Sequence, residues 1–513
     1  MKALCLGVSM TSLAQQHFTK TKELTQKISK DKIAEWLLRE GYYPEQYVLP
    51  PCFCVKEFSL RIDPYFKVTP DNGKKRYRVT RSDLLSIFFP KSHLTDRVFG
   101  IMEPQIYHDI VFHLMNNWDF VQGKVFHEDI LLFSYSFPIP VTEDTLGDLG
   151  TLRSGRMIYE YIEMAENDLI ADAHRFQYII TTDIKNFYPS IYTHSLSWAL
   201  HEKELARRDD EYDLFGNKID KLLQYANDRC TNGLAIGPVV SDLAAEILLA
   251  VIDRNCSNDL RRIDFLGVRF KDDYKVLCQS RSDADQIIKT LQRHMRMYNL
   301  NLNEGKTTVK ELPEGIFRPW ILEYQPFSFK KEDEISYRKF ETTLLEVLKI
   351  DSKYPDTGII DKFLSELITK DYQLKVSLEE KQWLKAISLL FMLKKRRAKS
   401  FPLILAIMEL MIKKYNENPK LKDTIIYNIG KHLQDKSDEL YDALWIVYFL
   451  KSQGHEIVPL PSIDQNSLLR SIRDNKQLFF DSKSEIQLFK PINDPGKNKP
   501  LAQHLAIFPK DED

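Results

Sequence analysis

The sequence predicts an α+β fold in which strands lie within the first 320 residues and helices make up most of the rest. Three observations predict it. Short apolar, strand-forming segments on both sides of Asp272-Asp273 indicate a β-hairpin. A β-branched and aromatic run from Tyr178 to Thr182 indicates a further strand, which ends in Asp183. Beyond residue 320, amphipathic segments separated by Pro, Gly, Asp and Asn indicate successive helices.

The composition is that of an ordinary globular protein of several domains. Its 513 residues exceed a single hydrophobic core, so two to four domains are expected. No apolar run approaches the length of a membrane span, and we expect no membrane partner. The start, Met1–Val8, faintly resembles a signal peptide, but its apolar part is short and no clear cleavage site follows. Six cysteines without a CxxC spacing predict reduced thiols and a cytoplasmic location.

The three aspartates form the candidate catalytic site. Adjacent carboxylates at a tight turn repel each other, although Asp-Asp is also common turn chemistry. A strand that delivers Asp183 opposite a hairpin tip carrying Asp272 and Asp273 favours a metal site instead. Magnesium takes hard oxygen ligands and is usually shared between carboxylates and substrate phosphates. The arrangement is that of two-metal phosphoryl transfer, in which one ion activates the attacking hydroxyl and the other stabilises the leaving pyrophosphate.

Four motifs in this order resemble the palm domain of reverse transcriptases. They are Asp183–Ile191, similar to motif A; Gly233–Pro238 followed by Ser241 and Glu246, similar to motif B; Phe270–Asp273, which matches motif C; and Leu302–Thr307, which matches motif D. The resemblance implies a right-hand polymerase with fingers and palm. It also implies a nucleotidyltransferase that uses two Mg²⁺ ions, for which Mn²⁺ can substitute, and deoxynucleoside triphosphates as substrates.

The resemblance also implies roles for residues of motifs A, C and D. Asp183, Ile184, Asp272 and Asp273 are the candidate metal-site residues. Asp183 and Asp272 would bridge the metal ions, and Asp273 would complete the acidic cluster with less direct coordination. Lys306 matches the motif D lysine, a candidate general acid for pyrophosphate. An exposed lysine with only a supporting role is the alternative.

Candidate nucleotide-binding residues come from motifs A and B. Tyr188, next to Phe187, matches the bulky residue that packs under the incoming sugar and excludes a 2′-hydroxyl; a core tyrosine is the alternative. Gly237 would let the backbone pass close to the nucleotide.

In the expected fingers, Lys91 and Arg97 are candidates for binding the triphosphate, because cations there would offset phosphate charge. Solvated surface bases are the alternative for both.

Taken in order, the chain divides into five expected regions. A helical leader is expected over 1–70, fingers over 71–175, the palm over 176–320, an all-α HEAT-like domain over 321–490 and a tail over 491–513. Helices of the fourth region are expected at 340–350, 359–369, 379–393, 403–414, 423–434 and 440–453. The connector Gly41–Phe53 is similar to the leader of bacterial defence-associated reverse transcriptases, including the abortive-infection (Abi) group.

Basic residues suggest where nucleic acid binds. The net charge of −1 means that any basic surface is local and balanced elsewhere. Lys271 stands where the family usually has Ala or Val, and could contact a phosphate or form an ion pair. The densest basic cluster, with Lys394, Arg396 and Arg397, is a candidate for gripping a phosphate backbone, with a solvated helix face as the alternative.

The resemblance to the Abi group implies anti-phage DNA synthesis without a template, primed from a tyrosine, by a homo-oligomer in the bacterial cytoplasm. The product would be single-stranded DNA attached to the protein. Tyr42, Tyr43 and Tyr47 lie in a connector that we expect to be flexible, and are the priming candidates. The alternatives are a reverse transcriptase that copies a bound non-coding RNA, and a non-catalytic scaffold that binds nucleic acid or a phage protein.

Overall fold

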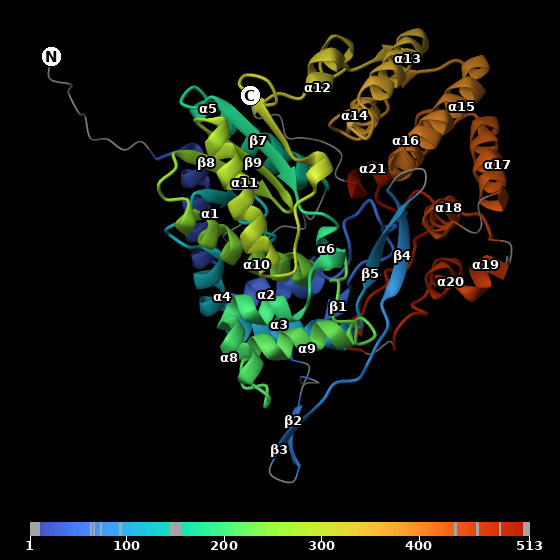
Figure 1. The fold of residues 1–513 in the computed structure, drawn as a ribbon. Coiled ribbons are helices and arrows are strands. Elements are labelled where there is room, and N and C mark those ends of the chain that lie inside the picture. The colour runs from blue at the N-terminus through green and yellow to red at the C-terminus, as the bar shows by residue number, and fades with distance from the viewer. Residues whose placement is uncertain are drawn as a thin grey trace, which may run out of the picture.

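The computed structural model describes residues 11–61, 64, 67–71, 74–91, 95–143, 149, 155–435, 439–457, 461–481 and 484–505. The segment that faintly resembles a signal peptide and the last residues of the expected tail, 506–513, lie outside the described residues. A β-sheet with helices packed on it fills one part of the molecule, and an arc of helices fills the other (Figure 1).

A five-stranded sheet carries the candidate site. Its strands are β6 (Leu132–Ser134), β7 (Tyr178–Asp183), β8 (Phe265–Phe270), β9 (Asp273–Cys278) and β10 (Thr308–Glu311), in the order β10-β7-β9-β8-β6. Neighbours are antiparallel except β6 and β8, which are parallel. The expected hairpin is β8–β9, and its turn consists of Lys271 and Asp272.

Helices that precede the strands of this sheet, or lie between them in the sequence, cover it. Helix α11 (Arg281–Arg296) packs on β7 and β9, α5 (Gly155–Ala173) on β8, and α1 (Leu13–Lys27) on α5 and β6. Helix α10 (Val239–Asp259) contacts α11 and β6 and is buried along most of its length. Its apolar residues face all directions, which is typical of a helix enclosed by protein.

A second group of helices packs below α10 in Figure 1. It comprises α2 (Lys30–Arg39), α3 (Pro104–Asn116), α4 (Trp118–Val125), α7 (His194–His201), α8 (Lys203–Arg208) and α9 (Phe215–Tyr225). Helices α3, α4 and α7 contact α10, and α2 and α9 contact α3. Ser29 caps α2, and Pro104 begins α3, where a missing N–H is tolerated.

Two hairpins come from the region expected to form the fingers. Strands β4 (Leu85–Pro90) and β5 (Asp96–Ile101) pair with each other, and β4 contacts α18 (Leu440–Ser452). Strands β2 (Lys67–Asp71) and β3 (Lys74–Arg78) form a hairpin that projects away from the body (Figure 1). Phe99 of β5 forms a bridge with Ile236, and the N–H of Gly100 donates to the carbonyl of Ile236. The β4–β5 hairpin is therefore fixed to the motif B loop.

The C-terminal region is mainly helical, as the sequence predicts. Its helices are α12 (Pro319–Tyr324), α13 (Tyr337–Lys353), α14 (Ile359–Glu366), α15 (Glu380–Arg396), α16 (Phe401–Lys414), α17 (Pro419–Asp435), α18 (Leu440–Ser452), α19 (Pro461–Gln465), α20 (Ser467–Asp474) and α21 (Leu501–His504). From α13 to α20, helices close in sequence pack on one another and form the arc in Figure 1. A capping box of Glu379 and Gln382 begins α15.

The C-terminal region is not all-α, which corrects the expectation. The short strands β11 (Ile335–Ser336) and β12 (Val376–Ser377) pair in parallel, and both contact α13. A third short strand, β13 (Ile486–Gln487), pairs with β1 (Glu57–Phe58) of the leader. The HEAT-like class of the arc remains a prediction.

The leader from Gly41 to Phe58 packs between the palm and the helical arc. The N–H of Lys490 donates to the carbonyl of Cys52, and the ring of His504 contacts the carbonyl of Gln46. The hydroxyl of Tyr441 in α18 donates to the carbonyl of Tyr47. The expectation of a flexible connector was therefore wrong, because backbone groups of the C-terminal region pair with those of the leader.

Candidate active site

The three aspartates meet at one end of the sheet. Asp183 ends β7 and is the register partner of Asp273, the first residue of β9. The N–H of Ile184 donates to the carbonyl of Asp272 at 3.1 Å, which fixes the hairpin tip against the end of β7. Residues separated by about ninety positions thus reach one site, as the motif order predicts.

Burial and mutual repulsion raise the pKa values of the hairpin carboxyls. For Asp272, burial raises the pKa most, the charge of Asp183 raises it further, and Lys271 and Arg97 oppose the rise. For Asp273, partial loss of hydration and then repulsion from Asp272 and Asp183 raise the pKa to about 7. The side chain of Asp273 still contacts water at the hairpin tip. Such a cluster of like charges favours a cation.

Lys306 supplies a cation at this site. It lies in a short 3₁₀ turn (Glu304–Lys306), and its ammonium donates to Asp183 Oδ2 at 2.5 Å. This hydrogen bond raises the pKa of Lys306, so the side chain is charged at neutral pH. The loop itself is tied to β7, because the N–H of Asn303 donates to the carbonyl of Asp183. The structure thus brings the motif D lysine to the motif A aspartate.

The donor set fits divalent metal ions that prefer oxygen ligands. Asp183 Oδ1 is buried and has no hydrogen-bond partner among the described residues, so an acceptor is available for a cation. Asp183, Asp272 and Asp273 offer only carboxylate oxygens, the ligands that Mg²⁺ takes. Within the described chain, no three His, Cys, Asp or Glu side chains are already close enough together to hold a metal ion. Asp183 and Asp272 are the residues that would hold one.

Motif A residues after Asp183 are joined to motif B. Tyr188 lies in the short helix α6 (Phe187–Ser190), and its carbonyl accepts a hydrogen bond from the N–H of Leu234 at 3.0 Å. The ring of Tyr188 is partly buried and meets the buried ring of Phe187 edge-on. The Tyr188 hydroxyl donates to Asp242, at the start of α10. Phe187 is thus a core residue, and Tyr188 lies at the edge of the site.

Gly237 is close to the leader and to the β4–β5 hairpin. Its φ of 129° favours glycine, and a Cβ there would lie 3.1 Å from Pro44 Cβ and 3.5 Å from the carbonyl oxygen of Gly100. The observed close approach is therefore to other parts of this chain, which accounts for the glycine without a nucleotide.

The two expected triphosphate ligands lie on the β4–β5 hairpin. Arg97 is exposed on β5 opposite Phe89, and its charge lowers the pKa of Asp272, so it faces the acidic cluster. Lys91 is exposed at the hairpin turn, where its N–H donates to the carbonyl of Thr95. Of the two, the structure brings Arg97 into electrostatic contact with the site.

Lys271 forms ion pairs within the protein. Its ammonium lies 3.7 Å from Asp242 Oδ1 and 3.8 Å from Glu45 Oε1, and its side chain is 27% exposed. Of the two roles expected for Lys271, a phosphate contact and an ion pair, the structure supports the ion pair. We therefore no longer expect Lys271 to bind nucleic acid.

The basic cluster of α15 is largely used inside the helical arc. Lys394 is buried against Asp442, with His432 Nε2 at 2.6 Å from its ammonium. Arg396 and Arg397 pair with carboxylates of other helices. The partners are Asp351 at 2.9 Å and Asp361 at 2.7 Å. The expectation that this cluster grips a phosphate backbone was wrong for Lys394 and Arg397, whose charges are paired and shielded from water; Arg396 remains about half exposed.

The three priming candidates are packed. Tyr42 and Tyr43 are buried, and their hydroxyls donate to the carbonyls of Met102 and Leu488. Tyr47 is partly buried, with its ring edge-on to Phe89. Because a priming hydroxyl has to reach an α-phosphate, the structure does not support Tyr42 or Tyr43 in this role.

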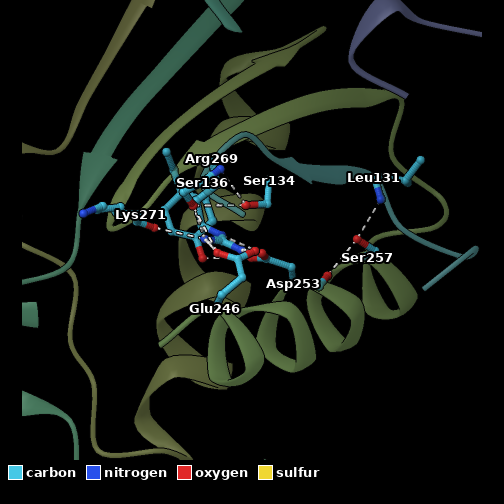
Figure 2. A network of polar contacts seen from close by, with 9 residues as sticks. Leu131, Ser134, Ser136, Glu246, Asp253, Ser257, Arg269 and Lys271 are labelled. Atoms are coloured by element: carbon cyan, nitrogen blue, oxygen red, sulfur yellow. Dashed lines mark hydrogen bonds and ion pairs between the residues drawn. The ribbon is translucent and has the colours of Figure 1, made fainter. Parts of the chain in front are cut away.

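A buried ionic network behind the hairpin was missed by the sequence argument. Figure 2 shows Arg269 of β8 between Glu246 and Asp253 of α10, with the hydroxyl of Ser136 also in contact. Its guanidinium pairs with Glu246 at 2.9 Å and with Asp253 at 2.7 Å, and it is fully buried. Two acids seven residues apart on an apolar helix, and one arginine in an apolar strand, were the available signal.

The network fixes the hairpin to α10. Arg269 also donates to the carbonyl of Lys271, the turn residue whose φ is 51°, and Tyr274 donates to Asp253. Burial raises the pKa of Glu246, but the charge of Arg269 and the hydrogen bonds that it donates lower this pKa by more. The pKa of Glu246 therefore lies below its usual value. The backbone that presents Asp272 therefore rests on a rigid, charge-balanced support.

Residues 143–337 match the family model described as reverse transcriptase (RNA-dependent DNA polymerase). This part of the chain, which contains the three aspartates and Lys306, is similar to a reverse transcriptase domain. No curated protein sequence matches the chain significantly. Among the described residues, no helix is both long and apolar enough to cross a bilayer.

Solved structures similar to this chain include telomerases, each at 14% sequence identity. Apo telomerase from Candida tropicalis aligns with a TM-score of 0.31 over 74% of this chain and 70% of its own. Telomerase from Candida albicans, in complex with a TWJ fragment of telomeric RNA, aligns with a TM-score of 0.23 over 53% of this chain and 52% of its own. This chain thus spans about half the length of the Candida albicans protein. Scores this low do not bear on function.

Proposed function

We propose that this protein is a DNA polymerase of the reverse transcriptase type, with deoxynucleoside triphosphates as substrates. The observation that carries the proposal is the meeting of Asp183, Asp272 and Asp273 at one end of the sheet, inside a segment that matches the reverse transcriptase family. The three carboxyls repel one another, and the buried Asp183 Oδ1 has no hydrogen-bond partner among the described residues. The fold reveals no structural purpose for such a group, whereas phosphoryl transfer requires it.

The reaction joins a primer 3′-hydroxyl to the α-phosphorus of the nucleotide, and the bond to the β-phosphate breaks as pyrophosphate leaves. Two Mg²⁺ ions, when bound, supply the charge that activates the hydroxyl and stabilises pyrophosphate. Asp183 and Asp272 are the carboxylates that would bind these ions. Lys306, protonated at neutral pH, holds a proton at Nζ for the leaving group, and Arg97 offsets the charge of the β- and γ-phosphates.

We propose a role in anti-phage defence of the abortive-infection type, because the Gly41–Phe53 connector resembles the leader of bacterial defence-associated reverse transcriptases. The proposal includes a homo-oligomer in the bacterial cytoplasm and a single-stranded DNA product, synthesised without a template and attached to a tyrosine of the protein. The burial of Tyr42 and Tyr43 weighs against these two as the attachment point.

Copying of a bound RNA is the second candidate. The matched family model describes RNA-dependent synthesis, which favours it. In this mode a bound RNA lies across the palm and sets the order of nucleotides, so the product sequence follows that RNA.

Two measurements on purified protein test these proposals. Incorporation of labelled dTTP is measured with poly(rA)·oligo(dT) and with no added nucleic acid, each with Mg²⁺ and with Mn²⁺. Intact mass then shows whether nucleotides are attached to the protein. A ladder of nucleotide masses supports protein priming, whereas unmodified protein with a labelled, template-dependent product supports RNA copying. No incorporation under any of these conditions contradicts the polymerase proposal itself.

A further inference from the structure

Four side chains from separate parts of the chain form a connected polar group beside the hairpin tip. Tyr188 of α6 donates its hydroxyl to Asp242 of α10. Lys271, the residue before Asp272, lies 3.7 Å from the same carboxylate and 3.8 Å from Glu45 of the leader. The order of contacts is Glu45, Lys271, Asp242, Tyr188, and we name this group the tyrosine latch.

The latch is shielded from water. The side chains of Glu45 and Asp242 are each 12% exposed, and that of Lys271 is 27% exposed. Asp242 lies in the first turn of α10, where the positive end of the helix dipole favours its negative charge. Contacts between charged groups in such a setting are stronger than those at the surface.

The latch is also fixed at its base. The carbonyl of Lys271 accepts a hydrogen bond from the buried Arg269 at 3.2 Å (Figure 2). Lys271 takes a φ of 51°, in the left-handed region, and this strained turn is held by the same arginine. The ammonium of Lys271 is thus presented to Asp242 from a rigid backbone.

We propose that Glu45, Lys271 and Asp242 act as positioning residues that lock the Tyr188 ring and so set the selectivity for the sugar. The proposal rests on the proposed polymerase function. Ribose and deoxyribose differ by one oxygen atom, so a ring discriminates between them sterically only when it cannot move aside. The hydrogen bond from Tyr188 to Asp242 prevents that movement, and the ion pair with Lys271 holds the Asp242 carboxylate in place.

The direct test compares sugar selectivity in Tyr188→Phe, Asp242→Ala and the double variant. The readout is kcat/KM for dTTP divided by kcat/KM for UTP, on poly(rA)·oligo(dT). Loss of one charge-assisted hydrogen bond predicts that each single variant lowers this ratio about tenfold. The double variant should lose no more than either single variant, because both remove the same contact.

Conservative variants separate positioning from general damage. Asp242→Asn keeps an acceptor for the Tyr188 hydroxyl and should restore part of the ratio, whereas Lys271→Met should lower it with the hydroxyl still in place. Asp285→Ala removes an exposed carboxylate on α11 and is the matched control, with no change expected. An unchanged ratio in both Asp242→Ala and Lys271→Met would overturn the proposal.

The latch can also be tested without substrate. In urea unfolding, Tyr188→Phe and Asp242→Ala should be coupled, so that the double variant is more stable than the sum of the two losses predicts. Additive losses would overturn the latch whether or not the protein incorporates nucleotides. Coupled losses in a protein that incorporates no nucleotide count against the polymerase proposal alone.

Discussion

Asp183 and Asp273 are register partners at the ends of β7 and β9, two strands that are separated along the chain by the whole of motif B. Their carboxyls share one end of the sheet with Asp272, and repulsion contributes to the raised pKa values of both hairpin aspartates. The protein thus maintains a group of carboxyls whose charges destabilise one another until a cation is near. Only Lys306 provides one by direct contact with Asp183 among the described residues.

Lys306→Ala should slow nucleotide incorporation about 10²-fold, because a positioned general acid contributes about that much. The fold should be unaffected, since the lysine side chain is 67% exposed. Single-turnover incorporation of dTTP measures the rate. Lys289→Ala, which removes an exposed lysine of α11, is the control. Equal rates for Lys306→Ala and Lys289→Ala would contradict a role of Lys306 as general acid.

Arg269→Met should destabilise the protein by about 3–5 kcal/mol, because it leaves Glu246 and Asp253 as uncompensated buried carboxyls. Burial already raises the pKa of Asp253 to about 6, which indicates how poorly this site tolerates an unpaired charge. Urea unfolding followed by circular dichroism measures the loss. Arg262→Met, at an exposed position just before β8, should change the stability by less than about 0.5 kcal/mol. Similar losses in both variants would contradict the structural role of the network.

Lys394→Met should destabilise the helical arc by about 3 kcal/mol, because Asp442 would be left buried without its partner. Its neighbour Lys395 is exposed, and Lys395→Met should leave stability unchanged. Binding of poly(rA), followed by fluorescence anisotropy across a range of salt concentrations, distinguishes the roles further. The salt dependence of binding should be the same for Lys394→Met and the wild type. If Lys394→Met, but not Lys395→Met, weakened the salt dependence of binding, Lys394 would be shown to contact nucleic acid.

Glu409→Gln should remove a pH dependence of stability between about pH 4.5 and pH 7. Burial raises the pKa of Glu409 from 4.5 to about 7, although the N–H of Leu501 and the charge of Lys413 oppose it. The native state then binds more protons than the unfolded state in this window, so the contribution of Glu409 to stability falls as the pH rises. At pH 8 the variant should be more stable than the wild type by about 1–3 kcal/mol, since glutamine keeps the acceptor for Leu501. Urea unfolding at pH 5 and pH 8 measures this, and equal differences at both pH values would contradict it.

The sequence predicts the parts of the site that depend on local pattern. A β-branched run ending in Asp183 and a hairpin with Asp272 at its turn are both short-range features, and the structure has both. The helices of the C-terminal region follow from apolar periodicity, and α13 to α18 lie where it places them. In each case the signal lies within one element.

Contacts between distant segments could not be predicted in this way. Pro and Gly in the Gly41–Phe53 connector suggest a flexible segment, but pairing of β1 with β13 and of Cys52 with Lys490 orders it. Charge density at Lys394 suggests a surface, but the partner that buries this side chain, Asp442, is 48 residues away. Lys271 has the same ambiguity, because Glu45 and Asp242 are unremarkable until the fold brings them together.

The most direct test of the central claim is nucleotide incorporation by the double variant Asp272→Asn, Asp273→Asn. Labelled dTTP is offered with poly(rA)·oligo(dT) and alone, with Mg²⁺ or Mn²⁺, and circular dichroism verifies that the variant is folded. We predict that incorporation by the wild type is lost in the folded variant, because amides hold divalent cations far more weakly than carboxylates do. Incorporation by the variant at the rate of the wild type would contradict the account of a carboxylate-held metal site.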